Sequence, residues 1–435
     1  MKRFIYQIGR FDVNYRNNLR FVYEGKPHEK PLSSLALKEH FGNDAEVVLV
    51  YPVSIVYNEY VVNRLKGNDD FVSKILNELD SYLSNPYEVL KEHPHNKEAD
   101  DFIVVHSLGK YKKPDGSGDV IFEGSYGDVV LGIVCDLIER YLKDRTQTVF
   151  YFDISSGHNI YVSALLEAAK HISVFGYLFN WLNKNFRPKI YIAFTEPILG
   201  SSEGEVRIYT EEMKFKAFFS SPIKAEGIKK PIRDNLRDYL EKFAIVFSAL
   251  KNNTPLAIYH FDYHDYKEIK NAIKGLIGKI KELLSQNWQK SQNLRKNDYI
   301  NTLLALGFYA GIVEVLSKDV HKYDINSGVH INTIKTQFCG GGIYDTFSLS
   351  THKGYLGVEL ENLRKRCNDN CRNINTWNSF HSDNAQDTKK FQRNFFAHAG
   401  FEDSVIQFKC SGKHIYLRYN PQKEKEIKKL LINNL

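Results

Sequence analysis

The stretch that decides the fold of this chain is Thr148-Val149-Phe150-Tyr151-Phe152-Asp153-Ile154-Ser155-Ser156-Gly157-His158-Asn159. Its first seven residues are almost all apolar, which is typical of a strand that is buried on both faces of a sheet. Residues 160–169 (IYVSALLEAA) follow at once and have the pattern of a helix. A strand that leads through a short polar loop into a helix is the repeating unit of a parallel sheet.

The segments around this stretch extend the same pattern through the first half of the chain. Apolar strand-like runs occupy residues 4–8, 45–51, 101–107 and 189–195. Helical patterns lie near residues 69–92, 126–144 and 159–183, and residues 205–209 are expected to add an edge strand. Strands that alternate with helices predict an α/β domain with a parallel, Rossmann-like sheet.

The second half of the chain has a different pattern, beginning near residue 222. Amphipathic helical segments occupy residues 230–251, 264–290, 294–317 and 354–366, residues 404–419 alternate like a hairpin with its turn at 411–413, and a last helix follows from 421. A polar stretch at about 319–353, which contains Gly340-Gly341-Gly342, is interpreted as an insertion. The sequence therefore predicts two domains, a Rossmann-like domain at 1–221 and a mainly α-helical domain at 222–435.

Composition and charge exclude several classes of protein. Hydrophobic residues make up 43% of the 435 residues, so packed cores rather than general disorder are expected. Lys and Arg exceed Asp and Glu by 59 to 52, a balance compatible with an anionic ligand or a nucleic acid. The apolar run at the start is too short for a signal peptide, and no membrane span is expected from the sequence. We expect a cytoplasmic protein.

The five cysteines, at positions 135, 339, 367, 371 and 410, do not have the spacing of a disulfide framework. Cys367 and Cys371 share a helix face and are compatible with a metal, but no second Cys/His pair follows at zinc-like spacing. Reduced, packed thiols are the expectation, with no metal site.

Two loops that follow strands are candidates for ligand binding, because ligands of parallel sheets bind beyond the carboxyl ends of the strands. One runs from Gly9 through Arg10 and Phe11 to Asn14, and the other contains Ser155, Ser156, Gly157, His158 and Asn159. The second opens a helix, whose free N–H groups and dipole favour an anion. Capping of that helix by Ser156 or Asn159 explains the same residues equally well. Ser125, at the start of another helix, is a weaker candidate. No dinucleotide or P-loop fingerprint is present.

The candidate for chemistry is Gln392-Arg393-Asn394-Phe395-Phe396-Ala397-His398-Ala399-Gly400. We expect a helix that ends near Gly400, with Asn394 and His398 on one face and Arg393 about 140° from His398. Phe395, Phe396 and Ala399 face elsewhere and are expected to pack into a core. Because the side chains of Arg393 and His398 point in different directions, a single helix does not bring them together well. Two copies of this helix packed across a two-fold axis would place two arginines and two histidines in one cleft.

The polar loop at 153–159 after a strand, followed in a later helical half by Arg393-Asn394 and His398, resembles one family. It is similar to the CARF–HEPN ribonucleases that accompany type III CRISPR systems, of the Csx/Csm accessory type. The resemblance implies a sensor domain that dimerises and binds a cyclic oligoadenylate, with cyclic tetra-adenylate as the expected ring, at Ser155, Ser156, Gly157 and Asn159 and at the opposing loop from Gly9. It also implies a dimeric effector domain, in a dimer or a higher oligomer, in which Arg393, Asn394 and His398 cleave single-stranded RNA without a metal.

The chemistry of these residues fits such a reaction. RNA carries its own nucleophile, the 2′-hydroxyl, so the enzyme has to supply proton transfer and charge stabilisation. An imidazole such as that of His398 transfers protons near neutral pH, and a guanidinium such as that of Arg393 holds a phosphate bidentately. Asn394 is suited to orient the histidine or the phosphate. The expected products are a 2′,3′-cyclic phosphate and a 5′-hydroxyl, released after allosteric activation by the bound ring.

Two other readings stay open at this point. The chain is alternatively a non-catalytic regulator that senses a nucleotide and signals to a protein or nucleic-acid partner. The sensor domain is also a candidate for slow cleavage of its own ligand, with Ser155, Ser156 and His158 as the available groups.

Overall fold

The computed structural model describes residues 1–143, 146–196, 204–292, 294–320, 326–340, 342–371, 375–380 and 388–435. The chain forms two compact units. The first unit contains Met1–Tyr177, Asn183–Lys216 and Lys274–Ile300, and the second contains Leu178–Leu182, Ala217–Ile273 and Asn301–Leu435. The division into functional domains at residue 221 stays a prediction.

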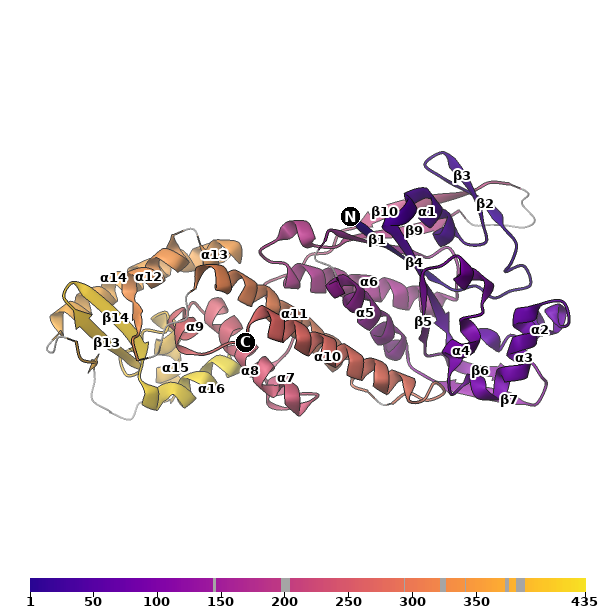
Figure 1. The fold of residues 1–435 in the computed structure, drawn as a ribbon. Coiled ribbons are helices and arrows are strands. Elements are labelled where there is room, and N and C mark those ends of the chain that lie inside the picture. The colour runs from indigo at the N-terminus through magenta and orange to yellow at the C-terminus, as the bar shows by residue number, and fades with distance from the viewer. Residues whose placement is uncertain are drawn as a thin grey trace. The chain divides into compact units, whose positions relative to one another are not determined.

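The first unit is built on an eight-stranded sheet, seen at the right of Figure 1. Its strand order is β3-β2-β10-β9-β8-β1-β4-β5. The strands are β1 (Lys2–Ile8), β2 (Leu19–Tyr23), β3 (Lys26–Lys30), β4 (Ala45–Pro52), β5 (Asp101–Val105), β8 (Thr148–Asp153), β9 (Lys189–Thr195) and β10 (Val206–Met213). The five strands from β9 to β5 run parallel, which confirms the Rossmann-like sheet.

Helices supply the crossovers of this sheet. They are α1 (Ser33–Phe41), α2 (Glu59–Leu65), α3 (Asp70–Tyr82), α4 (Pro86–Leu90), α5 (Tyr126–Lys143) and α6 (Asn159–Phe179). The helical pattern expected near 69–92 is confirmed as two helices, because α3 ends at Tyr82 and α4 starts at Pro86. A proline removes a backbone donor and is tolerated only in the first turn of a helix, which is where Pro86 lies.

The strand near 205–209 exists as β10, but it is not an edge strand. It pairs antiparallel with β9 on one side and parallel with β2 on the other, and β2 continues into β3. Strand β3 (KPHEK) is polar, and β2 (LRFVY) has an apolar run of only three residues, so the hairpin lacks the longer apolar run that marks the buried strands. A second hairpin, β6 (Leu108–Lys112) and β7 (Asp119–Glu123), lacks that run for the same reason.

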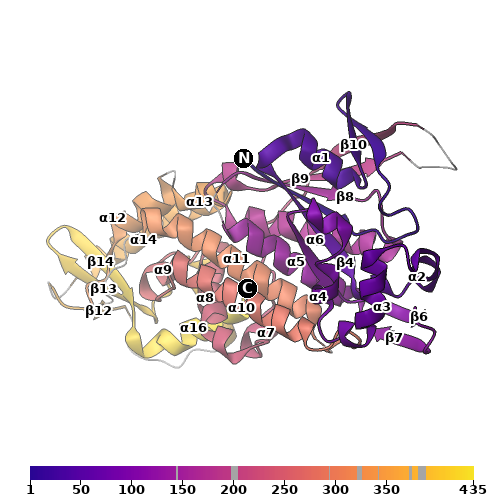
Figure 2. The same cartoon turned by 45° about the vertical axis from the view of Figure 1, so that its right-hand side comes forward.

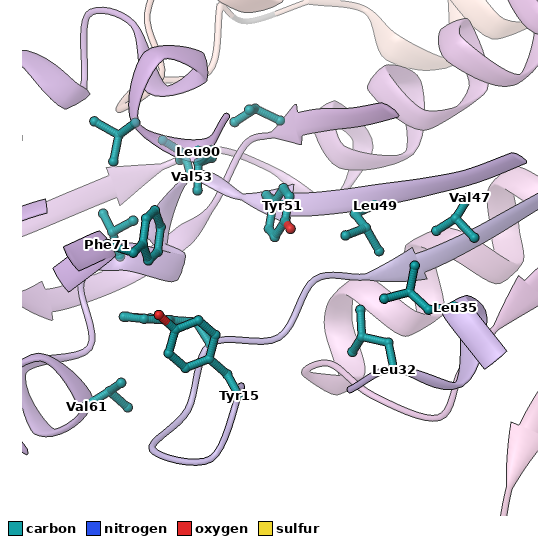
Figure 3. Close-up of a cluster of buried hydrophobic side chains, with 14 of the residues drawn as sticks. Tyr15, Leu32, Leu35, Val47, Leu49, Tyr51, Val53, Val61, Phe71 and Leu90 are labelled. Atoms are coloured by element: carbon teal, nitrogen blue, oxygen red, sulfur yellow. The ribbon is translucent and has the colours of Figure 1, made fainter. Parts of the chain in front are cut away.

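The two faces of the sheet follow from the alternation of side chains along each strand. Ile5, Val47, Leu49 and Tyr51 point to one face and join a buried cluster with side chains of α1, α3 and α4. Figure 3 shows Leu32 and Leu35 of the α1 region beside Val47 and Leu49, and Phe71 of α3 near Tyr15 and Val53.

Side chains on the opposite face meet α5. The Tyr6 hydroxyl donates to Asp136 at 2.6 Å, and that carboxylate also accepts from Arg140 at 2.8 Å. These buried polar groups therefore satisfy one another.

The second unit is mainly helical, with one small sheet (Figures 1 and 2). Its helices are α7 (Ala225–Lys229), α8 (Arg237–Lys251), α9 (Leu256–His260), α12 (Ile331–Ile334), α13 (Ile343–Thr346), α14 (Ser350–Asp369), α15 (Thr388–Ala397) and α16 (Glu424–Asn433), together with residues of α10 (Tyr266–Ser285) and α11 (Lys296–Asp319). The fold class expected from the sequence, an α/β sheet followed by a mainly helical half, is confirmed.

The small sheet has the order β11-β14-β13-β12. The strands are β11 (Val329–His330), β12 (Asn378–Ser379), β13 (Ile406–Ser411) and β14 (His414–Tyr419), and Figure 2 shows β12, β13 and β14 side by side. The hairpin of β13 and β14 confirms the expected alternation at 404–419, with Gly412 at a φ of 58° in its turn.

The region interpreted as a polar insertion is packed where the structure describes it. A short π-helix, η6 (Lys335–Cys339), follows α12, and Ile331, Ile334, Phe338 and Tyr344 are buried. Its role as an insertion stays a prediction.

One described helix, residues 296–318 of α11, is long and apolar enough to cross a membrane by length and composition. Of that stretch, 83% is buried inside the protein, as in the core helix of a packed domain. The burial makes this helix weak evidence for a membrane span, so the expectation of no membrane span stays a prediction.

Candidate functional site

The helix α15 ends at the histidine of the Arg/His stretch. The Gly400 N–H donates to the Phe395 carbonyl at 2.8 Å and the Ala399 N–H donates to the Phe396 carbonyl at 3.4 Å, the pattern of a Schellman motif. Ala399 and Gly400 have φ values of 51° and 79°. His398 is consequently the C-cap residue, and the expected helix end near Gly400 is confirmed.

The apolar side of α15 fixes its orientation in the second unit. Phe395 and Ala399 are fully buried, and the Phe395 ring packs 6.0 Å from that of Tyr419 on β14. The expected core face is confirmed for these two residues. Phe396 is half-buried.

His398 is paired with a carboxylate that the sequence did not reveal. Its Nδ1 lies 3.3 Å from Oε2 of Glu359, a residue of α14. The Glu359 side chain is 11% exposed, whereas that of His398 is 51% exposed. A proton on Nδ1, held by the carboxylate, leaves Nε2 as the exposed nitrogen of the ring.

Tyr355, one turn before Glu359 on α14, adds a second link between the two helices. Its hydroxyl donates to the carbonyl of Ala397, the residue before His398. Burial and the neighbouring Glu359 carboxylate raise the pKa of the Tyr355 hydroxyl. The two contacts hold the end of α15, with its histidine, against α14.

Arg393 and Asn394 lie on α15 one turn before His398. The His398 N–H donates to the Asn394 carbonyl at 3.0 Å, so these two residues are neighbours on one helix face. Arg393 is exposed and Asn394 is half-buried. The three candidate residues thus share one short helix, while their catalytic roles stay a prediction.

In the first unit, both candidate loops line a cavity of about 690 Å³. The cavity is formed beyond the carboxyl ends of β1, β4 and β8, where ligands of parallel sheets bind. Of the predicted ligand residues, Gly9, Arg10, Phe11, Gly157 and His158 line it.

Two of these are glycines because other atoms occupy the place of a side chain. A Cβ on Gly157, whose φ is 110°, would lie 2.7 Å from Cβ of Ile8. A Cβ on Gly9 would lie 2.1 Å from the ring of Tyr51. The loops therefore approach β1 and β4 more closely than any other residue type allows.

The remaining predicted ligand residues are not among those that line the cavity. The Ser156 hydroxyl donates to the Ile8 carbonyl at 3.1 Å and accepts from Gln7 at 2.9 Å, which joins the two loops. Ser125 caps α5, with its hydroxyl donating to Asp128 at 2.8 Å and accepting from the Asp128 N–H at 3.2 Å. Asn14 is exposed.

Ser155 and Asn159 lie on either side of Gly157. The Ser155 N–H donates to the buried carboxylate of Asp153 at 2.9 Å, and Asn159 begins α6. Burial raises the pKa of Asp153, which the hydrogen bonds of Ser155 oppose. The proposed contact of Ser125, Asn14, Ser155, Ser156 and Asn159 with a ligand stays a prediction.

Two buried histidines contact backbone carbonyls of the segment that begins at Gly9. The carbonyl of Arg10 lies 3.1 Å from Nε2 of His93, and the carbonyl of Tyr15 lies 2.6 Å from Nε2 of His95. Burial lowers the pKa of both imidazoles, that of His95 to about 4. Both rings are therefore neutral donors at neutral pH.

Sequence reasoning missed several residues of the cavity and of the histidine site. The cavity is also lined by Tyr57, Asn58, Tyr60, Lys110, Tyr111 and Lys112. Basic and aromatic residues alternate at 110–112 (Lys-Tyr-Lys), and this pattern in the sequence indicates a ligand that has negative charge and a flat group. Glu359 could also have been identified from the sequence, because it is a carboxylate on the same side of a helix as Leu356, Leu360 and Leu363, which are buried in α14.

One expectation about the cysteines is wrong. Cys371 and Cys410 form a disulfide, with Cα atoms 6.4 Å apart, because the end of α14 meets β13. Cys135 and Cys367 are free and buried, and burial raises the pKa of each thiol to about 12. Within the described ranges, no group of three or more His, Cys, Asp or Glu residues is placed to hold a metal.

The comparisons with known proteins agree with the two halves of the structure. Residues 4–197 match the family model of the CARF domain of the CRISPR system endoribonuclease Csx1. Residues 349–423 match the model of the HEPN domain of the same endoribonuclease, and this range contains α14, α15 and the hairpin of β13 and β14. No curated protein matches the chain. Since the two matches together span more than half of the sequence, the chain belongs to the CARF–HEPN ribonucleases of CRISPR systems.

Proposed function

We propose that this protein is a cytoplasmic endoribonuclease of type III CRISPR antiviral defence that cleaves single-stranded RNA when a cyclic oligoadenylate binds its first unit. The observation that carries the proposal is the pair of Glu359 and His398, which leaves an exposed, oriented imidazole on the helix of Arg393. This arrangement lies inside the range that matches the HEPN domain.

The reaction needs only groups that the chain and the RNA supply. A base removes the proton of the 2′-hydroxyl, the O2′ atom attacks the adjacent phosphorus, and the P–O5′ bond breaks. The products are a 2′,3′-cyclic phosphate and a 5′-hydroxyl, whose oxygen takes up a proton from the general acid. His398 transfers the proton through Nε2, Arg393 stabilises the charge on the phosphorane, and Asn394 positions the phosphate or the ring.

The site is complete in a homodimer. Arg393 and His398 diverge by about 140° on a regular helix, so one helix presents them to different sides. Two copies of α15 across a two-fold axis bring one arginine to the histidine of the other copy. One imidazole then serves as base and the second as acid.

The cavity of the first unit fits part of a cyclic oligoadenylate. Its volume suits a nucleotide, Lys112 and Lys110 carry positive charge (Lys110 lies 2.7 Å from Asp119), and Tyr57, Tyr60 and Tyr111 supply flat surfaces for adenine. Two carboxylates also line it, but Asp12 is paired with Arg10, and Glu59 lies 4.0 Å from Lys112. Cyclic tetra-adenylate is the proposed ring.

The test is cleavage of a labelled single-stranded RNA in EDTA, with and without cyclic tetra-adenylate or cyclic hexa-adenylate. We expect cleavage only with a ring, loss of cleavage in His398→Ala, and unchanged binding of the ring by that variant. Retained cleavage in His398→Ala overturns the assignment of the site. Binding of a ring without any cleavage by the parent protein identifies a regulator instead.

Cleavage of the ring by the first unit is a second candidate activity. Of the three groups available for it, His158 lines the cavity, whereas Ser155 and Ser156 do not. Chromatography of the ring after incubation with His398→Ala and with His158→Ala tests this activity separately from RNA cleavage.

A further inference from the structure

The small sheet of the second unit has two faces of opposite character. Alternate residues of β13 and β14 point inward and are buried, namely Ile406, Phe408, Cys410, Ile415, Leu417 and Tyr419. The residues between them point outward. The outer face comprises Trp377, Lys409, Tyr416, Arg418, His330 and His414, which come from β11, β13, β14 and the residue before β12.

Cations and aromatic rings alternate across this outer face. The Lys409 ammonium lies 5.2 Å from the centre of the Trp377 ring and 5.5 Å from that of Tyr416. The Arg418 guanidinium lies 4.1 Å from the centre of the Trp377 ring. Each cation is therefore held against a ring instead of extending freely into water.

Two histidines lie next to Tyr416 on the same outer face. The His330 ring lies 5.4 Å from that of Tyr416, and its Nε2 lies 3.3 Å from Nδ1 of His414. Burial lowers the pKa of His330, and His414 and Arg364 lower it further.

Among the described residues of this sheet and its neighbours, no carboxylate forms a salt bridge with Lys409 or Arg418. Cross-strand neighbours pair Gln407 with Arg418, Lys409 with Tyr416, and Ser411 with His414. Arg418 donates to the Gln407 amide at 2.9 Å, and neither Lys409 nor Arg418 forms a salt bridge within the described part of the chain. An unbalanced positive face with flat side chains suits an anionic partner that itself has flat groups.

We propose that this outer face binds single-stranded RNA and docks the substrate of the ribonuclease. Phosphates meet Lys409 and Arg418, and bases stack on the exposed surfaces of Tyr416 and of the paired Trp377 and Arg418. Such binding is sequence-tolerant, since every base has a flat face. The proposal rests on the proposed function for the identity of the ligand, but it concerns residues that take no part in the chemistry.

The test uses a fluorescent, unstructured 20-nucleotide RNA and His398→Ala, the variant expected to bind RNA without cleaving it. Adding Lys409→Glu and Arg418→Glu should raise Kd at least about 10-fold and lower the slope of log affinity against log salt by about 1.4, as expected for two contacts to a single strand. Lys425→Glu with Lys429→Glu makes the same charge change on the exposed side of α16 and should leave Kd within about two-fold.

Thermal melting shows whether the charge reversal unfolds the sheet. If it does, the double variant Lys409→Gln and Arg418→Gln, which removes the two charges without reversing them, replaces it in the test. With His398 intact, this pair should raise KM for a long RNA and leave kcat unchanged. An unchanged Kd and salt slope in a folded variant overturns the proposal. Loss of dimer by sedimentation, with unchanged RNA affinity, also overturns it and assigns the face to a second copy of the chain. Failure of the proposed function shows itself differently, as an absence of cleavage by the parent protein.

Discussion

Oε2 of Glu359 and Nδ1 of His398 lie 3.3 Å apart, joining two helices whose contacting residues are 39 positions apart in the chain. The carboxylate is almost buried and the imidazole is half exposed. This relationship gives the histidine one defined ring orientation, which an isolated surface histidine lacks.

Replacing Glu359 should therefore reduce catalysis without removing a group that touches the RNA. For Glu359→Gln we expect kcat to fall about 10- to 100-fold with little change in KM, since a misoriented imidazole transfers the proton less efficiently. Single-turnover cleavage with saturating ring measures this effect. Glu361→Gln, on the same helix but paired with Lys335, serves as the control. An unchanged kcat in Glu359→Gln would show that the pair is structural.

Arg393→Lys tests whether the guanidinium acts as a fork or only as a charge. Lysine keeps the positive charge but loses the two parallel N–H donors, so we expect kcat to fall about 10- to 100-fold and more in Arg393→Ala. Lys390→Ala, an exposed change on the same helix, should have activity close to that of the parent. Equal activity of Arg393→Lys and the parent protein would remove the bidentate contact from the mechanism.

Gly157→Ala tests the close approach of the cavity loop to β1. The added Cβ meets Ile8 at 2.7 Å, and the residue has a φ of 110°, so we expect a loss of roughly 1–3 kcal/mol in the free energy of unfolding and weaker binding of cyclic tetra-adenylate. Gly116→Ala, with a φ of 76° and no atom within 4 Å, carries backbone strain alone. If both variants melt at the same temperature, the contact with Ile8 has no energetic consequence.

His95 predicts how the stability of the first unit depends on pH. Its folded-state pKa of about 4 lies below the ordinary value of 6.5, mainly because of burial, with Arg10 lowering it further and Asp12 and Glu98 opposing. The unfolded chain binds more protons in that window, so stability is complete above pH 6.5 and falls as the pH decreases toward 4. Between pH 7 and pH 5 we expect a contribution of about 2 kcal/mol from this residue.

His95→Gln keeps a donor for the Tyr15 carbonyl but does not titrate, so its melting temperature should fall less between pH 7 and pH 5 than that of the parent protein. His158→Gln, at an exposed position, should follow the parent. Parallel curves for His95→Gln and the parent would contradict the assignment. The buried His260, whose pKa burial lowers to about 4, adds a similar slope in the second unit and is the same in all three proteins.

The sequence by itself determined the features that depend on local periodicity. Residues 148–154 are almost all apolar and residues 404–419 alternate, so β8, the parallel sheet and the hairpin of β13 and β14 were predictable. The end of α15 near Gly400 was predictable as well, because glycine is common just past the end of a helix. The expectation that Arg393 and His398 carry the chemistry came from their residue types together with the family resemblance, and it stays a prediction.

Tertiary structure alone decided which distant residues meet. Glu359 reaches His398, the 110–112 strand reaches the cavity beside Gly157, and Trp377 reaches Arg418 only after the helices and strands pack. Strands β2, β3, β6 and β7 were missed because their apolar runs are at most three residues long. Local sequence fixes backbone preference and the face on which a side chain lies, whereas contacts across 39 or more residues depend on the packing of the whole unit.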